Sequence, residues 1–341
     1  MPLSRRQFLA TAGTTAGLLA TQTGARAESS GLKPYAGRNV IIIRFGGGVR
    51  RQETINPSGT YSPYFLHDLV PRGVLFPAMS IDQFQDINTS HGEGTLYILT
   101  GKYQKYHDVD DRFLGGRFES QVPTLFEYFR AAYAVPEHEA LIINGEDRSD
   151  EDFYNFSNHH LFGLQYRSAT LSLFRYKVHL LRRRLAEGGM GEKERVELEV
   201  KLAEMEQIDY RVAKEQQQPE PIEQFWEGWR GYYGESGLVN ARGDALLTQL
   251  AVRAMEELRP RLMMINYQDP DYVHWGNPSH YFNGIAEIDR GMRQVVEASE
   301  RLEHYRDNTV FVIVPDCGRD SNRAQAVPFQ HHFNSRSAHE I

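Results

Sequence analysis

The sequence predicts an α/β fold: a mostly parallel sheet with helices on both faces and an inserted helical hairpin. Short runs of consecutive apolar residues alternate along the chain with longer segments that have helical periodicity. The apolar runs lack the polar alternation of a half-exposed strand, which indicates strands that are buried on both faces, as in parallel sheets. Ligands bind such sheets beyond the carboxyl ends of the strands, so we expect the functional residues in the loops that follow them.

The elements follow one another from residue 38 onward. The first strand is the apolar run NVIIIRF at 39–45, which enters the glycine-rich loop GGGVRRQET. The run GVLFPAMSI at 73–81 is a candidate second strand. Length and periodicity predict the remaining elements: helices at 88–103, 123–134, 244–258 and 279–302, and strands at 140–147, 261–268 and 308–315.

Residues 168–216 differ in character from the rest of the chain. Apolar residues recur there at three- and four-residue steps on both sides of the break EGGMGE: Leu171, Phe174, Val178, Leu181 and Leu185 before it, and Leu198, Leu202, Met205, Ile208 and Val212 after it. This pattern predicts two amphipathic helices that fold back on each other at the glycines. Their arginines and glutamates predict a solvated face, and a protein partner bound through 168–216 is compatible with it.

The composition is that of a globular protein, and it excludes two features. Of the 341 residues, 40% are hydrophobic and 24% are charged, and the formal net charge is −7. Proteins that bind nucleic acid usually present a basic surface, so we expect no nucleic-acid partner. The chain has one cysteine, Cys317, which excludes an internal disulfide.

The first 27 residues predict an export signal. Arg5 and Arg6 stand in an S-R-R-x-F-L frame, an apolar run covers 8–20, and an A-x-A cleavage site ends at Ala27. The run is 13 residues long, shorter than the roughly 20 that cross a bilayer, and no other segment of the sequence could span one. We therefore expect a periplasmic or extracellular protein, exported in folded form by the twin-arginine pathway.

Acidic and histidine side chains gather after two of the predicted strands and again near the end of the sequence. The three groups are Asp269, Asp271, His274 and His280; Asp316, Cys317, Arg319 and Asp320; and His331, His332, Arg336 and His339. Carboxylate and imidazole ligands held by different rigid elements are what a Zn²⁺ site requires. The sequence therefore predicts a divalent-metal site at the carboxyl ends of these strands.

Four segments resemble, in the same order, motifs of the alkaline phosphatase/sulfatase superfamily. They begin NVIIIRFGGG, HGEGTLYILTGKY, YQDPDYVHWGNPSHY and TVFVIVPDCGRD, so the resemblance spans most of 38–341. The combination GGGVRRQET and GRD…HH is similar to that of a subgroup of exported sulfatase-like proteins. The resemblance implies an alkaline-phosphatase-like fold and a first metal held by Asp271, His274 and one of His331, His332 or His339, with Asp269 as the alternative to Asp271. It implies that the segment of Asp316 supplies ligands of a second metal.

The sequence also departs from the superfamily pattern at three positions. Gly46 stands where the first strand normally ends in a metal-binding aspartate, and Glu53 is the nearest carboxylate. His91 stands ten residues before Gly101, where the nucleophile is expected, and Cys317 replaces a metal-binding histidine. As a lone cysteine at a strand end, Cys317 is interpreted as a small buried apolar residue, with metal ligation by its thiolate as the alternative. Glu53, His91 and Asp320 are candidates to rebuild the altered metal site.

Together these residues predict an exported metal-dependent hydrolase of phosphate or sulfate esters, acting on a small anionic ester. Ser90, Thr89 and His91 are the candidate catalytic residues, with a metal-bound water as the alternative nucleophile. The cofactor is one or two divalent metals, with zinc favoured over calcium or manganese. Candidate anion-binding residues are Arg50, Arg51, Arg319 and Arg336, because guanidinium matches a tetrahedral oxyanion. The alternative is a non-catalytic protein of the same fold that binds an anionic ligand or a protein partner in the periplasm.

The superfamily normally continues past its last histidine with another strand and a helix. This chain ends at Ile341, two residues after His339, and the final HEI resembles the start of a strand. From the sequence we therefore expect a domain that is truncated at its C-terminus relative to its relatives.

Overall fold

The computed structural model describes residues 32–80, 91–101, 120–145, 154–206, 218–234, 243–321 and 326–331. Residues 33–341 form one compact unit, separate from residues 1–32, and the description below concerns this unit alone. The predicted export signal lies outside the described residues, as do five of the candidate site residues: Thr89, Ser90, His332, Arg336 and His339.

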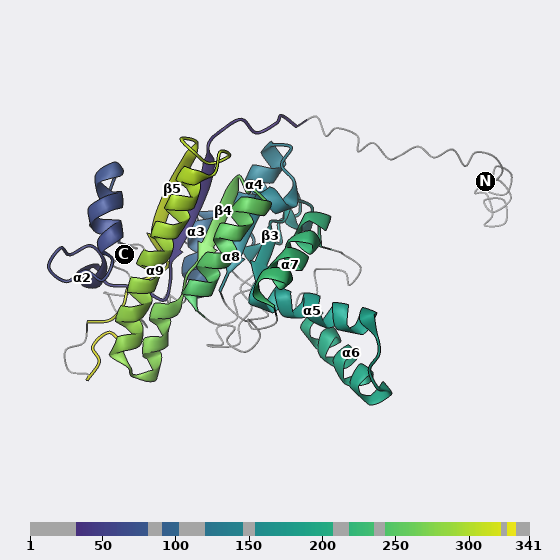
Figure 1. Cartoon of the computed structure of the whole chain (residues 1–341). Helices are drawn as coiled ribbons and strands as arrows, with labels where there is room; N and C mark the ends of the chain where they lie inside the picture. Colours follow the sequence, from purple (N-terminus) through teal and green to yellow (C-terminus); the bar gives the residue numbers. More distant parts are fainter. Residues whose placement is uncertain are drawn as a thin grey trace, which may run out of the picture. The chain divides into compact units, whose positions relative to one another are not determined.

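Five parallel strands form a single sheet. They are β1 (Asn39–Phe45), β2 (Ala140–Asn144), β3 (Ala169–Ser172), β4 (Leu262–Asn266) and β5 (Thr309–Pro315). The strand order is β3-β2-β4-β1-β5, and each neighbouring pair is parallel (Figure 1). The prediction of a parallel α/β sheet is therefore confirmed.

Helices cover both faces of this sheet, as predicted. The main ones are α3 (His91–Thr100), α4 (Leu125–Ala132), α5 (Leu173–Glu187), α6 (Glu192–Glu206), α7 (Glu220–Tyr233), α8 (Asp244–Glu257) and α9 (Pro278–Arg301). Ile41 and Ile43 of β1 join one apolar cluster with side chains of α7, α8 and α9, whereas Ile42 joins a second cluster with side chains of α3 and α4. Alternate residues of one strand thus supply both cores, which explains why the strand is an unbroken apolar run. Figure 1 shows α8 and α9 on the near face of the sheet.

Short helical segments connect these elements. They are α2 (Arg51–Thr54), η1 (Phe65–Leu69), η2 (Val70–Arg72), η3 (Glu137–Glu139), η5 (Gly163–Tyr166) and η7 (Asp269–Trp275). The last of them follows β4 directly and carries two of the predicted metal ligands, Asp271 and His274.

One predicted element is wrong and one helix was missed. The candidate strand at 73–81 is irregular over its described part, and Val74 and Phe76 are 81% and 69% exposed. Its apolar side chains do not enter the core, and Pro77 lacks a backbone donor for strand pairing. The sequence interpretation also missed α7, whose Ile222, Phe225, Trp226 and Trp229 are buried.

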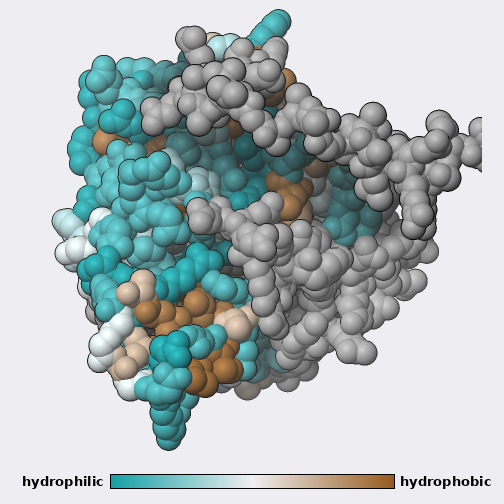
Figure 2. All heavy atoms as spheres, turned by 90° about the vertical axis from the view of Figure 1, so that its right-hand side faces the viewer, coloured by the Kyte–Doolittle hydropathy of each residue, from teal (hydrophilic) through white to brown (hydrophobic). Residues whose placement is uncertain are grey.

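The predicted helical hairpin is present as α5 and α6. The first residues of the predicted segment, however, belong to the sheet and not to the hairpin. Residues 169–172 form β3, an edge strand of the sheet, and Ser172 then caps α5 by accepting a hydrogen bond from the Arg175 backbone at 3.1 Å. No residue of α6 is buried, and surface ion pairs such as Arg184–Glu194 line the two helices. Figure 2 shows apolar side chains gathered on the side of the molecule that carries the hairpin. A protein partner at this surface stays a prediction.

Within the described part of the chain, no helix has both the length and the apolar character needed to cross a bilayer.

Candidate metal centre

The carboxyl ends of β1, β4 and β5 meet at one edge of the sheet. Phe45 at the end of β1 pairs with Pro315 of β5, and the neighbouring Arg44 pairs with Asn266 of β4. The loops after these strands are therefore adjacent, as the parallel topology requires. The N-terminus of α3 reaches the same edge, because its first residue, His91, contacts side chains of both loops.

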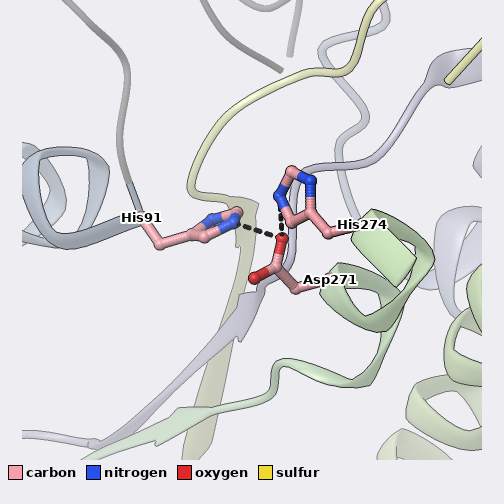
Figure 3. Close-up of side chains that lie close together, drawn as sticks. All are labelled: His91, Asp271 and His274. Atoms are coloured by element: carbon pink, nitrogen blue, oxygen red, sulfur yellow. Dashed lines mark hydrogen bonds and ion pairs between the residues drawn. The ribbon is translucent and has the colours of Figure 1, made fainter. Parts of the chain in front are cut away.

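Two predicted site residues, His91 and His274, approach one carboxylate oxygen of a third, Asp271 (Figure 3). Asp271 Oδ1 lies 2.8 Å from His91 Nε2 and 2.9 Å from His274 Nε2. Asp271 and His274 both come from η7, three residues apart, and a 3₁₀-helix places residues at this spacing on one face. His91 comes from α3, on the other side of the carboxylate. The three side chains are 13–24% exposed, so the cluster opens to solvent on one side.

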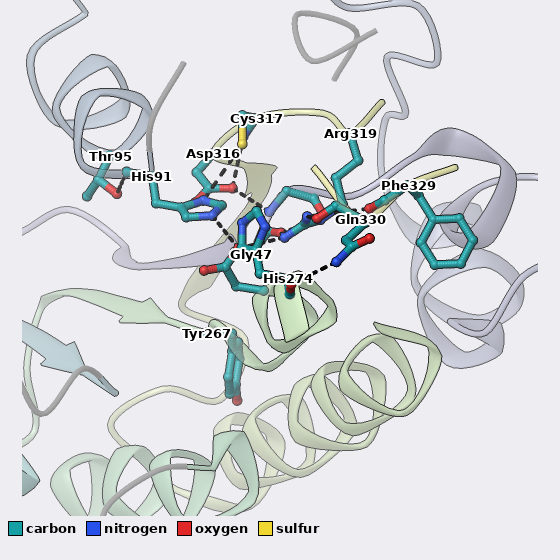
Figure 4. A network of polar contacts seen from close by, with 12 residues as sticks. Gly47, His91, Thr95, Tyr267, His274, Asp316, Cys317, Arg319, Phe329 and Gln330 are labelled. Atoms are coloured by element: carbon teal, nitrogen blue, oxygen red, sulfur yellow. Dashed lines mark hydrogen bonds and ion pairs between the residues drawn. The ribbon is translucent and has the colours of Figure 1, made fainter. Parts of the chain in front are cut away.

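The second nitrogen of His91 faces a different carboxylate. His91 Nδ1 lies 2.6 Å from Asp316 Oδ2 and 3.7 Å from the Cys317 sulfur (Figure 4). Asp316 Oδ1 accepts hydrogen bonds from the backbone N–H groups of Gly48, at 3.1 Å, and Cys317, at 2.8 Å. One imidazole is thus held between two carboxylates that belong to two different strand ends.

Glycines at three positions allow the segments to approach this closely. A Cβ on Gly94 of α3 would lie 2.1 Å from the Asp316 carbonyl oxygen, and one on Gly47 would lie 2.6 Å from the Asp271 backbone nitrogen. A Cβ on Gly46 would lie 1.9 Å from the Tyr267 carbonyl oxygen. Gly46 therefore leaves no room for the aspartate that the resemblance implies at this position.

Two buried arginines neutralise the carboxylates. Arg44 is 1% exposed and lies 3.6 Å from Asp316 Oδ2, while it donates to Thr95 Oγ1 at 2.5 Å and to the Tyr267 carbonyl at 3.1 Å. Arg319 is fully buried and donates to Asp271 Oδ1 at 2.6 Å. The remaining donors of Arg319 bind the backbone carbonyls of Gly47, Gly48, Phe329 and Gln330. The donors of Arg319 are thus used inside the protein, and its predicted role in binding a substrate anion stays a prediction.

The electrostatics follow from this arrangement. Burial alone would lower the pKa of His91, but the carboxylates of Asp271 and Asp316 outweigh it and raise that pKa well above its usual value. Burial alone would raise the pKa of Asp316, but His91 and Arg44 outweigh it and hold the pKa of this carboxyl well below its usual range. Burial and the nearby Asp316 raise the pKa of the Cys317 thiol. Without a metal, these shifts favour the imidazolium form of His91 between two carboxylates and the protonated form of the Cys317 thiol.

Two donor groups in the described part of the chain have a composition that suits a metal ion. The first is His91, Asp271 and His274, and the second is His91, Asp316 and Cys317. Two imidazoles and one carboxylate are a common zinc ligand set that leaves a coordination position open for substrate or water, so the first group fits zinc. The second group fits less well, because Asp316 is fully buried, already has four partners and lies beside Arg44.

Other predicted site residues lie outside these two groups. The carboxylate of Glu53 pairs with Arg50 and accepts a hydrogen bond from the Tyr281 hydroxyl at 3.3 Å. The two candidate anion ligands of this segment, Arg50 and Arg51, bond to Glu53 and to the carbonyl of Met79, respectively. Asp269 accepts from the Asp244 backbone at 3.1 Å and so caps α8.

His331 lies next to the centre, as the resemblance implies for one histidine of its segment. Its ring centroid is 5.5 Å from that of His274. Burial and the neighbouring His274 lower the pKa of His331, which favours the neutral imidazole that a metal binds.

The sequence interpretation missed Arg44, which fixes Asp316. A signal was present, because Arg44 is the one charged residue in the apolar run NVIIIRF. A charge inside a buried strand needs a buried partner of opposite sign, so its presence indicates a polar site at the end of that strand.

A scan against models of known protein families finds none that matches this chain, and a search of curated proteins finds no match.

Proposed function

We propose that the protein is a metal-dependent hydrolase of phosphate or sulfate esters with an alkaline-phosphatase-like fold, exported by the twin-arginine pathway. The observation that carries the proposal is the convergence of His91, Asp271 and His274 on one point at the carboxyl edge of the sheet. These donors come from two elements that are 180 residues apart in the chain, and they lie where α/β sheets bind ligands.

The proposed cofactor is one zinc ion, held by His91 Nε2, Asp271 and His274 Nε2, with His331 beside them. When bound, the ion would supply Lewis-acid polarisation of a phosphoryl or sulfuryl oxygen. Arg319 fixes Asp271, and Asp316 fixes the ring of His91 through Nδ1, so that the donors are oriented in advance. Asp316 and Cys317 are proposed as supports of the ligand His91 and not as a second metal site.

The proposed nucleophile is Ser90 or Thr89, which immediately precede His91 in the chain. His91 itself is less suited to act as a base, because both ring nitrogens already face carboxylates and the raised pKa favours the protonated ring in the metal-free protein. The substrate is proposed to be a small anionic ester, which would enter on the solvent-open side of the cluster.

The test is turnover of an aryl phosphate and an aryl sulfate by the zinc-loaded protein and by an Asp271→Ala/His274→Ala double variant. Loss of two ligands should lower turnover at least about 100-fold. A matched control removes a histidine and an aspartate that lie together on the surface of η1, as His67→Ala/Asp68→Ala. Turnover that is equal in the ligand variant and the control variant would contradict the proposal, as would its absence from the zinc-loaded wild type.

One observation favours the second candidate, a non-catalytic anion-binding protein. Arg44 pairs with Asp316 and Arg319 pairs with Asp271, so neither carboxylate lacks a cationic partner when the metal is absent. This candidate predicts that the metal-free wild type binds sulfate or phosphate as tightly as the zinc-loaded protein does, measured by isothermal titration calorimetry. If the protein is a zinc-dependent hydrolase, removing zinc should weaken its binding of sulfate or phosphate.

A further inference from the structure

The 3₁₀-helix η7 presents three different faces. With three residues per turn, side chains three positions apart lie above one another. Pro270 and Val273 form the buried face, and Asp271 and His274 form the face that enters the candidate centre. The third face carries Tyr272 and Trp275, about 120° around the helix from the proposed metal ligands.

Tyr272 and Trp275 form a stacked aromatic pair on this face. Their ring centroids are 5.1 Å apart and their planes are inclined by 20°. Trp275 is nevertheless 69% exposed, whereas the other two tryptophans of the chain, Trp226 and Trp229, are buried. Stacking on Tyr272 fixes the indole while leaving most of its surface in water. This is the arrangement of a platform that has a pre-oriented, unoccupied ring face.

We propose that Trp275, supported by Tyr272, binds a flat ring in the group that carries the ester, so that the preferred substrates are ring-bearing phosphate or sulfate esters. This inference rests on the proposed function for the anionic end of the ligand. Trp275 follows the proposed ligand His274 directly, with its side chain about 120° further around η7, so the inference requires the ring to extend from the ester group around the edge of this helix to the indole. Aromatic and pyranose rings share the required chemistry, a flat face that packs on an electron-rich ring.

The backbone around the platform is anchored. The Gln330 side chain donates to the His274 carbonyl at 2.9 Å, and Gly276 ends the helix with a φ of 82°, in the left-handed region that glycine tolerates. Trp275 is thus held between an anchored carbonyl and a fixed turn. A substitution at its exposed side chain should leave the fold and the ligands Asp271 and His274 in place.

The test compares anions in which carbon replaces the ester oxygen, so that hydrolysis cannot occur. The probes are phenylphosphonate, a C-glucosyl phosphonate and methylphosphonate, titrated into zinc-loaded protein with ¹⁵N-labelled tryptophan. The expected result is a shift of the Trp275 indole N–H signal, assigned with Trp275→Phe, by at least one ring-bearing probe. The affinity of the protein for that ring-bearing probe is then divided by its affinity for methylphosphonate. This ratio should fall about tenfold in Trp275→Ala.

Phe76→Ala is the matched control, because Phe76 is also 69% exposed but lies in the 73–80 segment. This variant should keep the affinity ratio of the wild type. An unchanged ratio in Trp275→Ala would overturn the inference, and so would the absence of binding by any ring-bearing phosphonate. The phenyl and glucosyl probes separate an aromatic from a pyranose ring.

The two proposals can fail separately in these experiments. If the binding of ring-bearing phosphonates depends on Trp275 but no ester is hydrolysed, the proposed ring-binding role of Trp275 holds and the proposed hydrolase activity is wrong. If esters are hydrolysed with a ring preference that Trp275→Ala does not change, the hydrolase stands and the platform is wrong.

Discussion

Arg44 is the residue that most clearly links the sheet to the candidate centre. Its side chain is buried at the end of a central strand, and it touches a carboxylate that lies 272 residues further along the chain. A buried ion pair of this kind adds little net stability compared with an apolar pair, but removing one partner leaves the other charged and unpaired in a dry environment. We therefore interpret Arg44 as a device that keeps Asp316 ionised and aimed at His91.

Replacing this buried arginine should be costly. We expect Arg44→Met to lower the free energy of unfolding by about 3 kcal/mol, because Asp316 would lose a buried cation. The exposed pair Arg72–Glu300, with a nitrogen–oxygen distance of 2.6 Å, is the control, and Arg72→Met should cost less than about 1 kcal/mol. Urea denaturation measures both values. Equal costs for the two variants would show that Arg44 does not hold a buried charge.

His91 shows how far a residue can be predicted from its position in the sequence. Its place ten residues before Gly101 marked it as a site residue, and its contacts with Asp271 and Asp316 agree with a site role. That its two ring nitrogens serve two strand ends could not be predicted, because that depends on how α3 is seated against the sheet.

At the scale of elements, α3 sits against β5 through a glycine. Because a Cβ on Gly94 would lie 2.1 Å from the Asp316 carbonyl, Gly94→Ala must push the helix away and move His91 with it. We expect a loss of about 2 kcal/mol of stability, as for other overpacked sites. At Gly231 of α7, by contrast, a Cβ would meet no atom within 4 Å, so Gly231→Ala should stabilise the protein by about 0.5–1 kcal/mol. Thermal unfolding of both variants checks the opposite signs, and stabilisation by Gly94→Ala would contradict the close packing of α3.

The start of α8 is tied to η7 by two carboxylates. Asp244 accepts from the backbone N–H groups of Gln268, at 2.9 Å, and Asp269, at 2.8 Å, and Asp269 accepts from the backbone of Asp244 in return. Burial, followed by the charge of Asp269, raises the pKa of Asp244 well above its usual value. This pair holds the segment that leads into Asp271, at the cost of burying an acid without a strong cationic partner.

The sign of the resulting pH dependence can be worked out. The folded-state pKa of Asp244 lies above the unfolded value of about 3.9, so its contribution to stability is fully present below that value and is lost as the pH rises through the folded pKa. Asp244→Asn cannot ionise and lacks this loss. The melting temperature of the variant minus that of the wild type should therefore increase from about pH 4.5 to about pH 7. A difference that stays constant or decreases over this range would contradict the buried, ionisable character of Asp244.

At the scale of the whole molecule, the strands were predictable because each is a run of consecutive apolar residues. β1, β2 and β4 are buried on both faces, whereas Val310 and Val312 of the edge strand β5 are each 43% exposed, which differs from the expected double burial. β1, β2, β4 and β5 follow from unbroken apolar runs, and parallel pairing then places their loops at one edge. β3 was missed because ATLS has four residues and Leu171 also fits the helical repeat that follows. Helix α7 was within reach of the sequence, since Ile222, Phe225, Trp226 and Trp229 have the spacing of a helical face.

The sequence predicts several of the side chains that gather at the candidate centre, but not how their charges are balanced. Asp271, His274 and Asp316 stand at strand ends and were identified from there. Which cations face them depends on strand register and on the path of the loop that brings Arg319 inside, and neither is written in local sequence patterns. The sequence predicts one or two metals, and the two arginines are the reason why only one is proposed above.

The zinc content of the purified protein tests the central claim most directly. After incubation with zinc and gel filtration, we predict about one zinc per chain in the wild type, and less than about a tenth of that in His91→Ala/Asp271→Ala/His274→Ala. The Cys317→Ala variant should retain the wild-type content, because Cys317 is not among the proposed ligands. A wild-type content below about 0.3 zinc per chain, or equal contents in the wild type and the triple variant, would contradict the proposed metal centre.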